Sequence, residues 1–298
     1  MTPTGARRLI GEYKVTTLPR LAIVYSVRDI AGSGAARALR ELIDAEKTTC
    51  PPPAEECWIL NNSVYLAGYD EETLYFTWLD TSPDPSADVV IILSRHSASS
   101  GKPSLTTHHT GNPTNDSSYG GEPYTLSFSA PPLSRTLLRN YRDAAEARGL
   151  LERYVVTLEA THHGPTSNKV PLVFIEIGST PEEWKDEKAQ ESMAEAVVGV
   201  LERGIDTGCR RVAGFGETHY PVKFTELHLN GEYCFGHIIP KYAFQKGVSE
   251  EVIRQAILKT WPGPAEAAVI RKKSIKSRYR QFVVDVVSSL SNVEVVIL

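Results

Sequence analysis

Short apolar runs alternate with helix-like stretches along most of this chain. The runs LAIVYS, DVVIIL and PLVFIEIGS are rich in β-branched residues and have the length of buried strands. Stretches such as GSGAARALRELIDAE repeat apolar residues at helical spacing, with a helix start expected near Gly34. Strands that alternate with helices favour an α/β protein, a three-layer α/β/α fold with a mixed, largely parallel sheet.

Turn and capping residues predict where further elements begin and end. Asn61, Asn62 and Ser63 lie between WIL and VYLAGY, and Asn230 and Gly231 lie inside ELHLNGEYCFGHII, which predicts two hairpins. Residues 180–183 form a capping box with proline at the first helical position. Strands are expected at TLYFTWL, PYTLSFS, YVVTLEA, RRVAGFG and VEVVIL, and helices over residues 134–148, 180–203, 249–259 and 280–290.

No internal repeat and no clear linker divide the sequence. We therefore expect a single α/β domain over residues 1–298, in which residues 244–298 form a C-terminal helical and strand segment. Residues 97–123 carry many Ser, Thr, Gly, Asn and Pro and almost no apolar residues, which is long for a loop in a compact domain. Such loops are usually functional or disordered.

Most histidines cluster in short stretches rich in Gly, Ser, Thr and Pro, and three of these stretches directly follow an apolar run. The loops beyond the carboxyl ends of the strands in an open α/β sheet share one edge, where ligands bind. We therefore expect these imidazoles to meet there. They are His96 after DVVIIL, His162 and His163 after YVVTLEA, His219 after RRVAGFG, and His108 and His109 in the loop TTHHTGNP.

The motif ATHHGPTS is the sharpest local signal. If His162 and His163 stay extended, their rings face opposite sides, whereas in a turn both could enter one site. Histidine titrates near neutral pH and is the commonest metal ligand. The alternative is a pair of surface imidazoles.

An acidic residue, Glu176, lies inside the otherwise apolar run VFIEIGS. A buried carboxylate needs a partner or a task, so Glu176 could orient a histidine, bind a metal or accept a proton from water. It could also lie at a strand edge, paired with Lys or Arg. Glu159 and Glu217 have the same ambiguity.

Cationic and hydroxyl side chains near the histidines suit the phosphate or ribose oxygens of a substrate. Arg95 and Lys102 lie in SRHSASSGKPS, and Thr161 and Thr166 flank the histidine pair. A mobile surface loop is the alternative for the first stretch. No H-E-x-x-H motif and no Walker A motif is present, and Arg37 replaces the third glycine of a dinucleotide fingerprint.

The net charge of −4 excludes a global basic field of the kind that would by itself signal nucleic-acid binding. Any RNA contact must come from a local patch, which could equally be a solvated surface. The densest basic cluster, with Tyr279 among its members, consists of Arg271, Lys272, Lys273, Lys276, Arg278 and Arg280.

Cysteine spacing and the amino-terminal segment bear on the cellular compartment. The four cysteines form no C-x-x-C pair, which argues against a cysteine metal site, and free thiols are favoured over a bridge between Cys50 and Cys57. The segment MTPTGARRLIGEYK lacks the apolar core of a signal peptide, and no apolar run approaches the ~20 residues that span a bilayer. We expect a soluble, cytoplasmic protein without a membrane partner.

Six blocks between residues 26 and 243 are SVRDIAG, SRHSASSGKPSLTTHHTGNP, EATHHGPTS, FIEIGSTPEEW, GETHYPVKFT and GHIIPKYA. In sequence and in order these blocks resemble the archaeal and plant D-aminoacyl-tRNA deacylases. A departure from the family is GFGETHYP, where a more glycine-rich turn is expected before His219.

The resemblance implies a zinc-dependent enzyme that hydrolyses the ester between a D-amino acid and tRNA, with a fold akin to peptidyl-tRNA hydrolase and the nucleoside phosphorylases. On this hypothesis His162 or His163 activates water directly or as a zinc ligand, and Glu176 orients or deprotonates. His96, His108 and His219 are the other candidate ligands. The expected partner is tRNA charged with a D-amino acid, and a monomer is expected.

Two alternatives stay open at this point. One is a zinc-dependent hydrolase or a phosphorylase that acts on a small amide or a nucleoside. The other is a noncatalytic tRNA-binding module.

Overall fold

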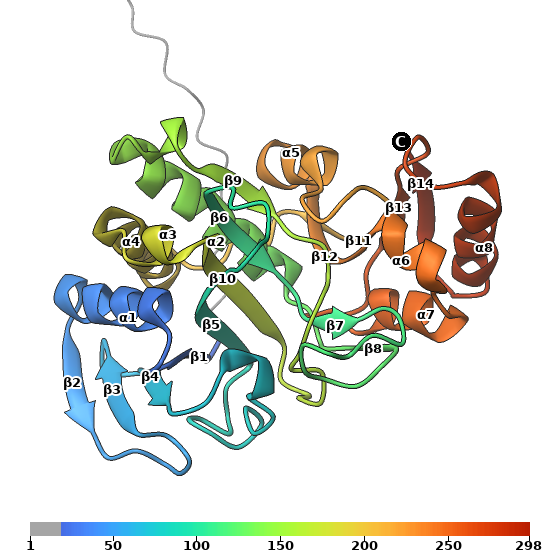
Figure 1. The fold of residues 1–298 in the computed structure, drawn as a ribbon. Coiled ribbons are helices and arrows are strands. Elements are labelled where there is room, and N and C mark those ends of the chain that lie inside the picture. The colour runs from blue at the N-terminus through green and yellow to red at the C-terminus, as the bar shows by residue number, and fades with distance from the viewer. Residues whose placement is uncertain (1–18) are drawn as a thin grey trace, which may run out of the picture.

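The computed structural model describes residues 19–298, and its largest feature is an eight-stranded sheet. The order of the strands is β2-β3-β4-β1-β5-β10-β6-β9 (Figure 1). Strands β4, β1, β5 and β10 run parallel, β6 runs antiparallel to β10, and β9 runs parallel to β6. The strands are β1 (Leu21–Ser26), β2 (Ala45–Thr48), β3 (Glu56–Leu60), β4 (Val64–Tyr69), β5 (Val89–Arg95), β6 (Ser104–His108), β9 (Val155–Leu158) and β10 (Leu172–Gly178).

Helices cover one face of this sheet, and an irregular segment covers the other. On the first face α1 and α2 both pack against α4, and their apolar sides share a core with Ile23, Leu93 and Ile175 (Figure 1). On the second face, Phe76 and Leu79 pack against the sheet. The helices of this part are α1 (Ile30–Leu42), α2 (Pro131–Ala147), α3 (Pro181–Trp184) and α4 (Glu187–Arg203), with 3-10 turns η1 (Thr73–Tyr75) and η2 (Leu150–Glu152).

The carboxyl-terminal part of the chain builds a second, fully parallel sheet of order β12-β11-β13-β14. Helices α7 and α8 pack together beside it, and a two-stranded ribbon of β7 and β8 lies nearby (Figure 1). The elements are β7 (Gly111–Asn112), β8 (Thr125–Leu126), β11 (Arg210–Phe215), α5 (Val222–Asn230), β12 (Tyr233–Ile239), α6 (Lys241–Lys246), α7 (Glu250–Leu258), β13 (Ala267–Ile270), α8 (Ser277–Ser288) and β14 (Glu294–Ile297).

The two sheets meet along the segment that follows β9. Here the backbone N–H of Ala160 donates to the carbonyl of His219 at 2.8 Å, and that of Thr161 donates to Ile238 at 2.9 Å. These bonds place the end of β9 beside the ends of β11 and β12. Residues that follow strands of both sheets can therefore contribute to one site.

The predicted α/β class with a mixed, largely parallel sheet is confirmed. The hairpin of β3 and β4, the final strand β14 and helices α2, α7 and α8 are present, with boundaries shifted by a few residues. Helix α1 begins at Ile30, earlier than predicted, because the Asp29 carboxylate accepts hydrogen bonds from the N–H groups of Ala31 and Gly32.

The predicted hairpin at Asn230 and Gly231 is wrong. Residues 222–230 form α5, which buries Phe224 and His228, four positions apart, on one side. Gly231 ends this helix through a bond from its N–H to the carbonyl of Leu227. The strand β12 that follows runs parallel to β11. An Asn-Gly pair favours a tight hairpin turn, but it also suits the end of a helix.

Four other element predictions are corrected. The stretch TLYFTWL forms η1 and turns instead of a strand, and only two residues of PYTLSFS are in a strand. The helix expected over residues 180–203 is divided, because Asp186 caps a second helix by accepting bonds from Lys188 and Ala189. Residues 97–123, expected to be a loop, contain the buried strand β6. Its sequence SLTTH is mostly polar and lacks the apolar run that predicts a buried strand. The Thr107 hydroxyl lies 3.1 Å from that of Ser134 on α2.

The expectation of free thiols is wrong for one pair of cysteines. Cys209, just before β11, forms a disulfide with Cys234 on the neighbouring strand β12. Cys50 and Cys57 are free, as expected. The sequence spacing of 25 residues carries no signal for the pairing, which depends on the parallel contact of the two strands.

Within residues 19–298, no helix combines the length and the apolar character needed to cross a membrane. The amino-terminal segment in which a signal peptide was considered, residues 1–14, lies outside the described residues.

Candidate active site

Side chains from the strand ends of both sheets gather at one place. His96 directly follows β5, His108 ends β6, and His162 and His163 come shortly after β9. His219 comes from the loop after β11 and reaches the same place, with its ring centroid 5.7 Å from that of His96 and 4.7 Å from that of His162. The prediction that imidazoles far apart in sequence converge is confirmed for these five residues. It is wrong for His109, which lies outside the site with Nδ1 3.2 Å from the Gly236 carbonyl.

Two buried carboxylates, Glu159 and Glu176, lie at the centre of these imidazoles. Glu159 Oε2 is 2.8 Å from His219 Nε2, 3.2 Å from His96 Nδ1 and 3.5 Å from His162 Nε2. Glu176 Oε2 is 3.3 Å from His108 Nε2 and 3.5 Å from His96 Nδ1. His96 therefore bridges the two acids. We call His96, His108, Glu159, His162, His163, Glu176 and His219 the histidine–carboxylate cluster.

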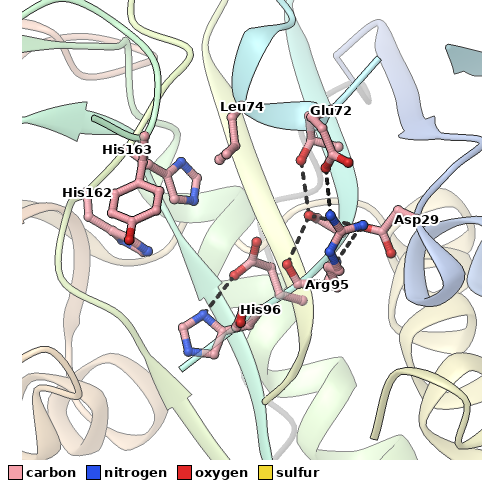
Figure 2. A pocket seen from close by; sticks show the side chains of 12 residues that line it. Asp29, Glu72, Leu74, Arg95, His96, His162 and His163 are labelled. Carbon is pink, nitrogen blue, oxygen red and sulfur yellow. Dashed lines mark hydrogen bonds and ion pairs between the residues drawn. The ribbon is translucent and has the colours of Figure 1, made fainter. Parts of the chain in front are cut away.

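The backbone of His163 explains why both rings of the pair enter the cluster. Its φ of 45° lies in the left-handed region, which a non-glycine residue adopts only where the surroundings impose it. The turn brings the rings of His162 and His163 within 4.3 Å, and Figure 2 shows both at the same side of the site. Of the two arrangements considered for this pair, the turn is the one found.

Hydrogen bonds to carbonyl groups set the tautomers of the pair. His162 Nδ1 lies 2.8 Å from the Ala160 carbonyl, and His163 Nδ1 lies 2.6 Å from that of Gly164. Each Nδ1–H donates to its carbonyl, which leaves a lone pair on Nε2. In His162 that nitrogen faces Glu159.

Burial and charge give the imidazoles different protonation states. Burial lowers the pKa of His96, but contacts with Glu176 and Glu159 outweigh it and raise the pKa to about 9. The pKa of His108 also rises, because the charge of Glu176 outweighs burial. Burial and neighbouring imidazoles lower the pKa of His162, and they lower that of His163 to about 4. The two carboxylates thus favour protonation of His96 and His108, and burial favours the neutral form of His162 and His163.

The carboxyl groups respond in the opposite sense. Burial by itself would raise the pKa of Glu159 and Glu176. Contacts with His219 and His96 lower the pKa of Glu159, and His108 and His96 lower that of Glu176. Both acids are therefore ionised at neutral pH.

A cavity of about 330 Å³ opens beside the cluster. One wall carries His96, His162, His163 and Glu176. Another is built around Arg95, whose guanidinium lies 2.7 Å from Glu72 and 3.8 Å from Asp29 (Figure 2). The volume lies at the lower end of the range for small-molecule pockets. It suits the end of a substrate and is too small for a folded nucleic acid.

Comparison with known proteins identifies the family. The model of the D-aminoacyl-tRNA deacylase family matches residues 83–296. The chain belongs to this family. The expectation from the six sequence blocks is confirmed: the protein is a hydrolase of the D-aminoacyl-tRNA deacylase family.

Several relatives align with this chain over nearly their whole lengths. The D-aminoacyl-tRNA deacylase of Aeropyrum pernix is 48% identical over 266 residues, which is 89% of this chain and 95% of that protein. The protein of that name from Methanosarcina barkeri is 34% identical, with 92% and 89% covered. A crystal structure titled as a conserved protein of unknown function, AF0625, superposes with a TM-score of 0.84 at 28% identity, and covers 94% of this chain and 95% of that one.

The cluster of this deacylase-family chain fits a metal ion. Both carboxylate oxygens of Glu159, Glu176 Oε2 and His108 Nε2 are buried, and within the described residues none makes a hydrogen bond of good geometry. Neutral imidazole nitrogens and carboxylate oxygens are typical ligands of zinc and of other first-row divalent metals. Ligand atoms within 4.8 Å of one another occur in His96, Glu159, His162 and His219, in His108, His162 and His163, and in His108, Glu159 and Glu176.

The other predicted site residues lie around the cluster without entering it. Arg95 lines the cavity, whereas Lys102 is exposed on the loop between β5 and β6. The Thr161 hydroxyl accepts the N–H of Ile238 at 2.9 Å, and that of Thr166 accepts the N–H of Glu122 at 2.9 Å. Both hydroxyls therefore hold loops in place around the site.

The basic segment belongs to the second sheet. It runs from the end of β13 into α8 and consists of Arg271, Lys272, Lys273, Lys276, Arg278 and Arg280. Arg271 Nε lies 3.2 Å from Glu217, two residues before His219, and the N–H of Glu217 donates to the Ser274 hydroxyl. The segment thus contacts the loop that carries His219.

Two residues that contact the imidazoles were not assigned to the site from the sequence. Glu159 could be a site residue or a carboxylate at a strand edge paired with Lys or Arg, because only the path of the chain after β9 turns it inward. Tyr220, whose hydroxyl lies 2.8 Å from His96 Nε2, was missed. Its position next to His219 was the only available signal.

Proposed function

We propose that the histidine–carboxylate cluster carries the D-aminoacyl-tRNA deacylase activity of this chain, the hydrolysis of the ester between a D-amino acid and the terminal ribose of tRNA. The observation behind this proposal is the placement of two buried carboxylates among five imidazoles beside one cavity. An ester with a ribose leaving group needs an activated water and a stabilised oxyanion, and no covalent nucleophile.

His162 and His163 are the proposed acceptors of the water proton. Each offers an Nε2 lone pair, because its Nδ1–H donates to a carbonyl. His96, held between Glu159 and Glu176 and protonated at neutral pH, is the proposed donor to the leaving ribose oxygen. Glu176 keeps His96 and His108 oriented.

The proposed metal is zinc, held by His96, Glu159, His162 and His219 or by sets that include His108 and His163. An imidazole nitrogen that binds the ion has no lone pair left for a proton. In the first set, His163 is therefore the remaining proton acceptor, and His96 serves as a ligand in place of its role as a protonated donor. When bound, it would lower the pKa of water toward ~7 and polarise the ester carbonyl. Deprotonated imidazoles are required for such binding, so metal uptake should release protons from His96 or His108. Elemental analysis of the purified protein tests the identity of the metal.

Arg95, in the wall opposite the imidazoles, is the proposed contact for a ribose or phosphate oxygen of the substrate. Its salt bridge with Glu72 fixes the guanidinium while leaving part of it open to the cavity. Lys102 is proposed as a more distant phosphate contact, and Thr161 and Thr166 as residues that position the loops around the substrate.

The basic segment is the proposed contact for the tRNA backbone. Lys272, Lys273, Lys276 and Arg278 are exposed, and Arg271 links the segment to the His219 loop. Lys272→Ala with Lys273→Ala should weaken tRNA binding and lower the slope of log K against log salt by about 2. Lys188→Ala on α4 is the control. An unchanged slope would contradict this part of the proposal.

We infer a cytoplasmic enzyme, since its substrate belongs to translation, and propose that it acts as a monomer. Size-exclusion chromatography with light scattering tests the oligomeric state, and fractionation of cells tests the compartment.

The decisive experiment compares D- and L-aminoacyl-tRNA on purified protein. Release of the D-amino acid with the L-aminoacyl-tRNA spared supports the proposal. Loss of both esters, or of neither, would contradict it. Turnover of a small amide or a nucleoside in place of aminoacyl-tRNA would favour the hydrolase or phosphorylase alternative, and tRNA binding without turnover would favour a binding module.

A further inference from the structure

An exposed tyrosine stands at the mouth of the cavity. Tyr119 lines the cavity, yet 70% of its surface is accessible to solvent. Within the described residues its ring has no aromatic or cationic neighbour, and its hydroxyl makes no hydrogen bond. A large aromatic ring with a free face at a binding site is typical of a stacking contact.

The backbone of Tyr119 is fixed to the turn that carries the catalytic imidazoles. Its carbonyl accepts the N–H of Gly164 at 3.0 Å, directly after His163. The carbonyl of the next residue, Gly120, accepts a hydrogen bond from the Asn112 side-chain amide at 2.8 Å. A β-carbon on Gly164 would lie 2.6 Å from the nitrogen of Gly121, so the two loops pack backbone against backbone. The position of the tyrosine relative to His163 is therefore set by the fold.

The covalent structure of the substrate places a nucleobase near the Tyr119 ring. The scissile ester joins the amino acid to the ribose of the terminal adenosine, and the adenine is attached to that same ribose. If the ester carbonyl lies at His162 and His163, the adenine lies one sugar away, toward the mouth. The cavity of about 330 Å³ has no room for a paired stem, so the nucleotide enters as a single strand whose base is free to stack.

We propose that Tyr119 stacks on the terminal adenine of the tRNA and so positions the ester at the imidazoles. This inference rests on the proposed function and adds a residue that recognises the nucleotide. The base is the same in every substrate, whereas the amino-acid side chain varies. A stack is indifferent to that variation, since it reads only the face of the base.

Kinetics of Tyr119→Ala, Tyr119→Phe and Leu258→Ala test the inference. The last variant removes a comparable apolar side chain from the surface of α7, where Leu258 is 48% exposed. Loss of one base–aromatic stack should raise KM for D-aminoacyl-tRNA by about 10-fold with kcat close to that of the unchanged protein. Tyr119→Phe keeps the ring and should behave as the unchanged protein, as should Leu258→Ala. The ethyl ester of the same D-amino acid has no base, so its hydrolysis should not respond to any of the three changes.

A binding measurement separates this inference from the proposed function. An uncharged CCA trinucleotide that ends in 2-aminopurine should lose fluorescence on the unchanged protein and on Tyr119→Phe, but not on Tyr119→Ala. Quenching that survives in Tyr119→Ala, or an equal rise of KM for the ethyl ester, would overturn the stacking contact even where deacylation is intact. If the unchanged protein quenches the fluorescence but does not deacylate D-aminoacyl-tRNA, the proposed function is refuted. The stacking contact is then still supported.

Discussion

The eight histidines of this chain fall into two groups with different surroundings. Five belong to the histidine–carboxylate cluster, where one ring nitrogen faces a carboxylate or the cavity. The other three, His109, His228 and His237, are buried outside it and bond to backbone groups. His109 Nδ1 contacts the Gly236 carbonyl, His228 Nδ1 accepts the N–H of Phe235, and His237 Nε2 contacts the Ser127 carbonyl.

The contrast teaches that burial alone does not distinguish a reactive imidazole from a structural one. His108 and His109 are adjacent and both buried, but strand alternation sends their side chains to opposite sides of the backbone. The pKa of His108 rises beside Glu176, whereas burial lowers that of His109. Nearby carboxylates, and not exposure, separate the two groups.

Removal of both His162 and His163 should have the largest effect on turnover. His162→Ala with His163→Ala should lower kcat by about 10³-fold or more, because both proposed proton acceptors are lost. The tRNA affinity, measured by filter binding, should stay close to that of the unchanged protein. His228→Gln is the matched control outside the cluster and should retain activity at moderate temperature. A binding defect as large as the kinetic one would place the pair in tRNA recognition instead of chemistry.

A change in Glu159 should expose the role of the carboxylates as metal ligands. Glu159→Gln removes the charge that contacts His219, His96 and His162 while keeping the volume. We expect about 10- to 100-fold lower metal affinity and a similar loss of activity. Metal content is measured by elemental analysis, and added zinc should partly restore turnover.

Glu226→Gln, on the exposed side of α5, is the control for this change. If Glu159→Gln binds as much zinc as the unchanged protein when zinc is limiting, Glu159 is not a metal ligand. Chelation of the unchanged protein should likewise abolish deacylation.

Acidification should destabilise the fold through the imidazoles that burial keeps neutral, which are those of His109, His228 and His237 together with His162 and His163. Burial lowers the pKa of His237 to about 4 and that of His228 to about 3, below the usual value of 6.5 that applies in the unfolded chain. Between pH 6.5 and the lowered pKa of each histidine, the unfolded state binds more protons than the folded state. The free energy of unfolding therefore falls as the pH drops below 6.5. For His237 the loss reaches about 3 kcal/mol near pH 4.

Urea unfolding at pH 7.5, 6, 5 and 4 measures this dependence. His237→Gln should be less stable at pH 7.5 but should lose less on acidification. An equal pH slope in the variant and the unchanged protein would show that His237 is not buried as a neutral ring.

Cleavage of the Cys209–Cys234 bond should have the smallest effect on the chemistry. The disulfide closes a loop of about 25 residues in the second sheet, away from the carboxylates. Cys209→Ser with Cys234→Ser should cost roughly 3 kcal/mol of unfolding free energy, with kcat unchanged. Thermal unfolding and the deacylation assay provide the two readouts. A reduced kcat would indicate that the disulfide positions the His219 loop.

Much of the fold could be predicted because its signals are local. The apolar runs of β1, β5 and β10 fit buried strands, and a capping box marks the start of α3. The errors arise where a local pattern has two solutions. Asn230-Gly231 suits a hairpin or a helix end, and the polar strand β6 is stabilised by pairing with β10 and β9, which no local pattern records.

The sequence by itself determined the α/β class, the family and the histidines worth testing, since these depend on residue types in short, ordered blocks. Only the tertiary structure decided which histidines share a site, because pairing of strands distant in the chain sets which ends meet. It brought Glu159 into contact with His219 and turned His163 through a left-handed backbone. Electrostatic and hydrogen-bonding interactions act over a few ångströms, so their strength depends on this folding and not on spacing along the chain.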